Sequence, residues 1–219
     1  MGMLPGAFIF DMDGLMFDTE RLGQKAWHEV GGRLGIEIGE DILSQIRGGT
    51  AAANCEVFRR AFGPTFDYAA AKALRNELAE KDIQKHGLPV KPGLGALLRT
   101  LKAHNIPAAV ASSSPRATVQ RYLKMAGLAE YYRAIVGAED STRSKPAPDC
   151  FLLAAQRLGT AAERCLVLED SANGLLAAKA AGMQAICIPD ISLPHEEALQ
   201  YAAAVLPTLA DVWPWLHRA

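Results

Sequence analysis

Short apolar runs recur along the chain, and each ends at a polar or small residue. They cover residues 7–10, 107–111, 134–136, 165–169, 184–188 and 203–206. Between them lie amphipathic helical patterns over residues 95–104, 117–125, 150–158 and 175–181. Apolar strands without internal alternation, separated by helices, are typical of a parallel sheet that is covered on both faces. We therefore expect an α/β fold, with helices that end at Gly127, Gly159 and Gly182.

One long stretch interrupts this rhythm. From Thr19 to Leu88 there is no strand-like run, and three or four helical patterns take its place. A parallel sheet does not normally leave roughly 70 residues between its first two strands. We therefore expect a helical subdomain over residues 18–88, inserted into an α/β core formed by residues 1–17 and 89–219.

Polar side chains follow the apolar runs. Asp11 and Asp13 come after the first run, a triplet of serines that starts at Ser112 comes after the second, and Glu169-Asp170 closes the fourth. Lys145 lies in the loop after the third run. Ligands of open parallel sheets bind beyond the carboxyl ends of the strands. We therefore expect these groups to converge on one edge of the sheet.

This set of residue types suits phosphoryl transfer. Crowded carboxylates repel one another unless a cation neutralises them. Oxygen ligands without nearby His or Cys favour Mg²⁺. A hydroxyl and an ammonium can hold the remaining phosphoryl oxygens, and a carboxylate can act as the nucleophile.

The segment FDMDG, the serine run, the K-P pair and the E-D pair together resemble the haloacid dehalogenase superfamily. They are most similar to its branch of β-phosphoglucomutase and small sugar-phosphate phosphatases. The resemblance covers essentially the whole chain, because the helical insert is similar to that family's cap domain. It implies a Rossmann-like core and a Mg²⁺-dependent phosphatase that forms an aspartyl-phosphate.

By this resemblance, Asp11 is expected to be the nucleophile and Asp13 the general acid and base. The metal ligands would be Asp11, the backbone carbonyl of Asp13, and Asp170. Glu169 is expected to be a nearby carboxylate, either on the metal or supporting it.

The phosphate ligands follow from the same resemblance. Ser112 is expected to bind the phosphoryl group, with Ser113 as an alternative. Lys145 would orient the nucleophile and neutralise the transferred group. The backbone N–H groups of Met12 and Asp13 are expected to complete the cradle.

Within the insert, Arg47 precedes Gly48-Gly49 between two helical patterns. The family's cap places a loop over the active site there, so Arg47 could reach the far end of a substrate. Glu20 lies at the first crossing into the insert and could also contact substrate.

Other residues have simpler interpretations. Ser113 and Ser114 can cap the helix that Pro115 opens. Three lysines are expected on solvated faces, namely Lys81, Lys85 and Lys91.

Three other functions are compatible with parts of this pattern. A sugar-phosphate mutase of the β-phosphoglucomutase subgroup typically carries a His five residues after the aspartate that matches Asp18, and Gly23 stands there. Dehalogenases typically lack the second aspartate, whereas Asp13 is present. A non-catalytic scaffold would be expected to lack a catalytic carboxylate. These departures favour a phosphatase, with the mutase as the alternative.

Composition limits the partners. The formal net charge is −1, which does not favour capture of nucleic acid or of an anionic membrane. The four cysteines show no C-x-x-C spacing, and the N-terminus has no basic region before its apolar run. We expect a cytoplasmic monomer acting on a small phosphorylated metabolite. The resemblance to the family implies candidates such as hexose or deoxyhexose phosphates, phosphoglycolate and pseudouridine 5′-phosphate.

Overall fold

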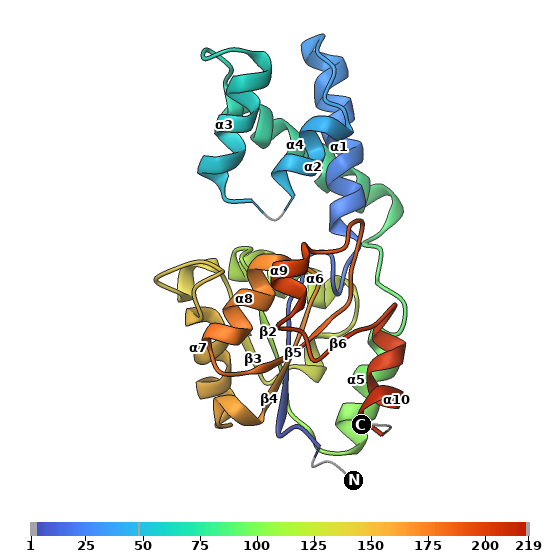
Figure 1. Cartoon of the computed structure of the whole chain (residues 1–219). Coiled ribbons are helices and arrows are strands. Elements are labelled where there is room, and N and C mark those ends of the chain that lie inside the picture. The colour runs from blue at the N-terminus through green and yellow to red at the C-terminus, as the bar shows by residue number, and fades with distance from the viewer. Residues whose placement is uncertain (1–3, 48, 218–219) are drawn as a thin grey trace. The chain divides into compact units, whose positions relative to one another are not determined.

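The chain forms two compact units in the computed structural model, which describes residues 4–47 and 49–217. The first unit comprises Met1–Asp18 and Leu88–Ala219, and the second comprises Thr19–Gly87 (Figure 1). Each boundary lies one residue from the position expected from the sequence. The two units have separate hydrophobic cores and are described separately below.

The first unit contains a six-stranded sheet in the order β3-β2-β1-β4-β5-β6, and every neighbouring pair is parallel. The strands are β1 (Ala7–Phe10), β2 (Ala108–Ala111), β3 (Ala134–Val136), β4 (Cys165–Glu169), β5 (Gln184–Cys187) and β6 (Ala204–Val205). The chain runs outward from β1 through β2 to β3, then returns to β4 on the other side of β1. This is the doubly wound order, and its switch point between β1 and β4 is where such sheets bind ligands. The predicted α/β class is confirmed.

Helices cover both faces of this sheet (Figure 1). They are α5 (Leu94–Ala103), α6 (Arg116–Met125), α7 (Asp149–Leu158), α8 (Ala172–Ala180), α9 (Glu196–Leu199) and α10 (Val212–Leu216). The short 3₁₀ helices are η1 (Ala129–Tyr131), η2 (Ala138–Asp140), η3 (Ala162–Arg164) and η4 (Leu209–Asp211). One face packs α7, α8 and α9 onto alternate strand residues such as Ile9 and Val167. Because three of the four cysteines are buried in that same core, they act there as small apolar side chains.

The helix ends follow local sequence chemistry. Gly127, Gly159 and Gly182 have φ of 66°, 66° and 71°, so the predicted left-handed glycines are confirmed. Helix α8 begins three residues before the predicted start. Ser171 explains the difference, because its side chain accepts a 3.1 Å hydrogen bond from the amide of Gly174 and caps the helix.

An ion-pair network ties η2 to two helices. Asp140 accepts hydrogen bonds from Arg116 and, at 2.9 Å, from Arg157. It also accepts a 2.8 Å bond from the amide of Gly137. The hydrogen bonds from Arg116 and then Arg157 hold the pKa of Asp140 well below its usual value.

The second unit consists of α1 (Thr19–Leu34), α2 (Glu40–Ile46), α3 (Ala51–Phe62) and α4 (Tyr68–His86). Its core combines aliphatic side chains with a cluster of aromatic rings, in which the centroids of Trp27 and Phe58 are 4.7 Å apart. Such a core explains how an insert of this size can fold as a unit. Among the described residues, no helix combines the length and apolar character needed to span a bilayer.

The two chain crossings between the units lie side by side. The amide of Asp18 donates to the carbonyl of Pro89 at 3.0 Å, and the amide of Lys91 donates to the carbonyl of Met16 at 2.9 Å. An antiparallel bridge joins Phe17 to Val90 between them. The segments that enter and leave the helical unit are thus held together on the α/β unit.

Candidate active site

The first strand places Asp11 at the switch point of the sheet. Strand β1 is fully buried, and the amide of Asp11 continues its ladder by donating to the carbonyl of Leu168 at 3.0 Å. The side chain therefore emerges at the carboxyl edge, between β1 and β4. Asp11 is only 8% exposed, so its carboxylate lies in a largely dehydrated place.

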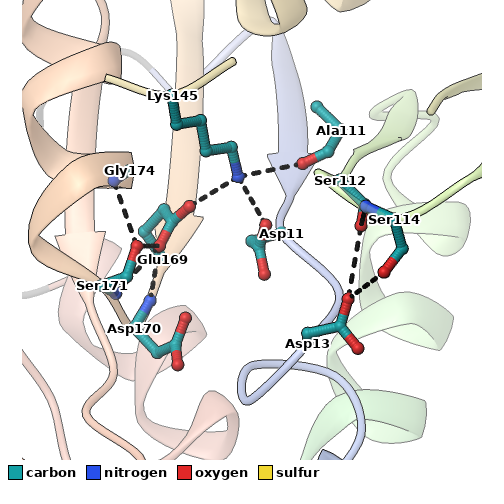
Figure 2. Close-up of polar contacts among 10 residues, drawn as sticks. All are labelled: Asp11, Asp13, Ala111, Ser112, Ser114, Lys145, Glu169, Asp170, Ser171 and Gly174. Carbon is teal, nitrogen blue, oxygen red and sulfur yellow. Dashed lines mark hydrogen bonds and ion pairs between the residues drawn. The ribbon is translucent and has the colours of Figure 1, made fainter. Parts of the chain in front are cut away.

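Lys145 is buried beside this carboxylate (Figure 2). Its ammonium forms an ion pair with Asp11, donates to Glu169 Oε1 at 2.7 Å, and donates to the carbonyl of Ala111 at 3.1 Å. The ring of Phe151 covers it at 4.7 Å from the centroid. Three acceptors match the three N–H groups of a lysine, so the charge is fully satisfied and fixed in place.

The electrostatics of the pair follow from burial and charge. Burial lowers the pKa of Lys145, but Asp11 and Glu169 outweigh it and keep that pKa above its usual value. Burial is also the main cause that raises the pKa of Asp11 to about 7; Lys145 opposes the rise, while the charges of Glu169 and Asp13 add to it. The negative charge at this edge thus exceeds what one lysine neutralises.

Glu169 is completely buried, and both of its oxygens are engaged. While Oε1 accepts from Lys145, Oε2 accepts from the amide of Asp170 at 3.0 Å and from the amide and hydroxyl of Ser171 at 2.9 Å. Gly174 leaves the necessary room, because a Cβ there would lie 1.8 Å from the carboxyl carbon of Glu169. These bonds favour the supporting role of Glu169 over direct metal coordination.

Asp13 faces the serine run after β2 (Figure 2). Its Oδ2 accepts a 2.8 Å hydrogen bond from the hydroxyl of Ser114 and a long, 3.5 Å one from Ser112. The expected helix cap by Ser114 is wrong. Helix α6 is preceded by Pro115 and has no side-chain cap, because the Ser114 hydroxyl is committed to Asp13.

Asp170 lies over the turn that follows Asp13. Gly14 has φ 83°, and a Cβ there would lie 2.2 Å from Asp170 Oδ2 and 3.5 Å from Asp190 Oδ2. Asp190 also accepts a 2.6 Å bond from Lys91, whose side chain is only 15% exposed. The expectation that Lys91 is solvated is therefore wrong, whereas Lys81, 63% exposed, and Lys85 are solvated as predicted.

The arrangement fits a cation that needs few protein ligands. In the part of the chain that the structure describes, no three His, Cys, Asp or Glu side chains are placed to hold a metal by themselves. Mg²⁺ usually binds through one or two carboxylates and keeps water and phosphate oxygens. Asp11 and Asp170 with the backbone carbonyl of Asp13 are oxygen donors of the kind that such a cation takes.

Other predicted site residues are placed as follows. Ser113 is exposed, and Met12 is buried with its carbonyl accepting from the amide of Met16 at 2.9 Å. Glu20 and Arg47 belong to the helical unit, where Arg47 pairs with Glu40. The roles of these four residues toward a substrate stay predictions, and Gly48 lies outside the described residues.

The sequence did not predict the roles that four residues have at this site, namely Lys91, Ser114, Ser171 and Asp190. Ser171 had a local signal, since a serine directly before a helical pattern is a common cap. The others become visible only when distant segments meet. Lys91 and Asp190 are 99 residues apart, and Ser114 and Asp13 are 101 apart.

Comparison with known proteins shows that the chain is similar to one family of hydrolases. A family profile described as haloacid dehalogenase-like hydrolase matches residues 5–182. A Drosophila melanogaster protein named "Probable pseudouridine-5'-phosphatase" is 35% identical, over 94% of this chain and 90% of its own length. A fructose-1-phosphate phosphatase of Escherichia coli is 34% identical, over 81% and 93%. The crystal structure of CbbY from Rhodobacter sphaeroides in complex with phosphate superposes with a TM-score of 0.80 at 27% identity, covering 95% of this chain and 96% of that one.

Proposed function

The chain belongs to the haloacid dehalogenase-like hydrolases, and from that premise we propose that it is a Mg²⁺-dependent phosphatase of small phosphorylated metabolites, working through an aspartyl-phosphate on Asp11. The observation that carries the proposal is the buried ammonium of Lys145, fixed between Asp11 and Glu169. A dehydrated carboxylate next to a fixed positive charge is suited to meet a phosphoryl group, whose own negative charge would otherwise repel it.

In the first half of the reaction, a carboxylate oxygen of Asp11 attacks phosphorus and the bond to the leaving oxygen breaks. Asp13 gives its carboxyl proton to that oxygen, so the product leaves as a neutral alcohol. Ser112 donates a hydrogen bond to a non-bridging oxygen, and the fixed positive charge of Lys145 offsets the negative charge of the transferred group. The products of this half are the free alcohol and an acyl phosphate, the aspartyl-phosphate of Asp11.

In the second half, Asp13 is a carboxylate and can take a proton from water. The water oxygen attacks phosphorus, the bond to Asp11 breaks, and inorganic phosphate leaves. Asp11 returns to a carboxylate and Asp13 to an acid, so the cycle closes. Asp11, Asp170 and the backbone carbonyl of Asp13 would hold Mg²⁺, which when bound supplies positive charge against the phosphoryl oxygens.

The names of the relatives guide the choice of substrates. Fructose 1-phosphate and pseudouridine 5′-phosphate are the first candidates, because proteins with about a third of their residues identical are named for acting on them. Arg47 in the helical unit is the proposed contact for the leaving group. The chain would act as a monomer.

The test is a phosphate-release screen with Mg²⁺ over a panel of phosphorylated metabolites that includes both candidates. Asp11→Asn keeps the size of the side chain and removes the nucleophile, so it should release no phosphate from any substrate. A variant Asp11→Asn as active as the wild type would refute the mechanism, and a wild type inactive on the whole panel would refute the function.

The mutase alternative is disfavoured by a feature of the helical unit. Gly23 lies in α1, and a Cβ built on it would be 1.9 Å from an η-nitrogen of Arg75 in α4. The guanidinium of Arg75 therefore stands in this chain where the side chain of a histidine would begin, and it is the absence of that histidine that disfavours the mutase. Conversion of β-glucose 1-phosphate to the 6-phosphate in a coupled assay, without release of inorganic phosphate, would favour the mutase.

A further inference from the structure

Ser114 is fixed at three atoms, all within the α/β unit. Its hydroxyl donates to Asp13 Oδ2 at 2.8 Å, its amide donates to the hydroxyl oxygen of Ser112 at 2.9 Å, and its carbonyl accepts from the amide of Ala138 at 3.0 Å. The two backbone bonds fix the main chain of Ser114, and the bond from its hydroxyl to Asp13 holds the side chain in one orientation. The hydroxyl of Ser114 is therefore a rigid donor aimed at the carboxylate of Asp13 (Figure 2).

Ser112 and Ser114 have different hydrogen-bonding roles beside Asp13. Ser112 is only 2% exposed and uses its oxygen to accept from the amide of Ser114, which leaves its own proton for another acceptor. Its bond to Asp13 is long, at 3.5 Å, so that proton can move to a phosphoryl oxygen at little cost. The 2.8 Å bond from Ser114 then remains as the contact that orients Asp13.

We propose that Ser114 is a positioning residue for the acid–base carboxylate of Asp13, an inference that rests on the proposed phosphatase function. A general acid must lie within hydrogen-bond reach of the oxygen that it protonates, in a defined orientation. The hydroxyl of Ser114 holds Oδ2 of Asp13 and so orients the carboxyl group that carries the proton. That proton passes to the leaving oxygen, and in the second half a proton from water returns to the same carboxylate.

A positioning role predicts a dependence on the leaving group. An alkyl phosphate needs the proton from Asp13, because an alkoxide is a poor leaving group. With p-nitrophenyl phosphate the leaving phenolate is stable without a proton, so the acid matters little. The ratio kcat/KM reports the first half of the reaction for both substrates and therefore isolates this step.

The experiment measures kcat/KM of Ser114→Ala with fructose 1-phosphate, or the best alkyl phosphate of the screen, and with p-nitrophenyl phosphate. General acid–base catalysis contributes about 10² to 10⁴-fold, and we expect loss of orientation to remove about tenfold with the alkyl phosphate. The loss with p-nitrophenyl phosphate should stay within about twofold. Ser114→Thr keeps the hydroxyl and should restore the alkyl rate.

Two further variants keep the result interpretable. Ser114→Cys retains a similar size but is a weak donor, so it should behave like Ser114→Ala, and it replaces that variant if alanine prevents folding. Ser141→Ala removes a hydroxyl that has no hydrogen-bond partner among the described residues of the same unit, so it should leave both substrates unaffected.

Three results would overturn the positioning role: no loss in Ser114→Ala, an equal loss with both substrates, or Ser114→Thr as impaired as Ser114→Ala. Failure of the proposed function looks different. In that case Asp13→Asn would retain full activity with the alkyl phosphate, or no alkyl phosphate would be hydrolysed by the wild type.

Discussion

Replacing Glu169 with glutamine tests how the site holds its buried charge. The wild-type carboxylate accepts four hydrogen bonds, one at Oε1 from Lys145 and three at Oε2 from the amides of Asp170 and Ser171 and the hydroxyl of Ser171. Glutamine has one accepting oxygen and one donating NH₂ group. Its NH₂ must therefore face either the ammonium or the amides, whichever way the side chain turns.

Both orientations have a cost that can be worked out. If the oxygen stays with Asp170 and Ser171, the NH₂ group faces the ammonium of Lys145 and that pair is broken. If the oxygen faces Lys145, two buried amides lose their acceptor, at about 1–3 kcal/mol each. Breaking one partner of a buried ion pair costs about 3–5 kcal/mol. We therefore expect Glu169→Gln to lower the free energy of unfolding by about 2–5 kcal/mol.

The assay is urea denaturation followed by circular dichroism, with the midpoint compared at an unchanged m value. Glu163→Gln is the matched control, because Glu163 is exposed in η3 of the same unit. Its effect should stay within about 0.5 kcal/mol. Glu169→Gln as stable as Glu163→Gln would refute the view that Glu169 is an obligatory acceptor for these donors.

Gly174→Ala should lower both stability and phosphate release, because the new Cβ would lie 1.8 Å from the carboxyl carbon of Glu169. Gly32→Ala is the control, since Gly32 lies in open space on α1, and it should be neutral or up to about 1 kcal/mol more stable. Thermal unfolding compares the two variants. Asp140→Asn should be less stable than the wild type at neutral pH. Since its two arginine partners depress the folded-state pKa of Asp140, their contribution is complete above about pH 4 and is lost below it, so the difference in denaturation midpoint should shrink on acidification. Chelation of Mg²⁺ should abolish phosphate release. Asp170→Asn should raise the Mg²⁺ concentration that restores phosphate release, as measured by titration with Mg²⁺. Phosphate release that is independent of Mg²⁺ would contradict both expectations.

The sequence located the site residues that stand at the ends of apolar runs. Asp11 and Asp170 directly follow the residues that form β1 and β4, and parallel strands bring such ends to one edge. Lys145 is expected at the same edge because its loop follows the third run, and the resemblance to the family gives its role. Its loop has no regular structure, so nothing local dictates that its ammonium turns inward.

Residues whose environment depends on distant partners were harder to predict. Lys91 resembles any lysine near a proline, and only the folded chain brings it to Asp190. Ser114 stands before a proline at the start of a helix, where a cap is the usual outcome. Its hydroxyl instead binds Asp13, because the doubly wound order places the ends of β1 and β2 next to each other.

The balance of charge connects the fold to the need for a cation. Asp11, Asp13, Glu169 and Asp170 bring four carboxylates to this edge, and Lys145 is the ammonium bound among them. Two of its three hydrogen bonds already go to carboxylates, so it can offset only part of their charge. A phosphate monoester that carries two negative charges of its own would therefore meet net repulsion at the dehydrated carboxylate of Asp11. Burial is the main cause of the raised pKa of Asp11, and the charges of Glu169 and Asp13 add to it. A neutral carboxyl group would attack phosphorus poorly. In the reaction proposed above, the two positive charges of Mg²⁺ held near Asp11 and Asp170 would offset both effects.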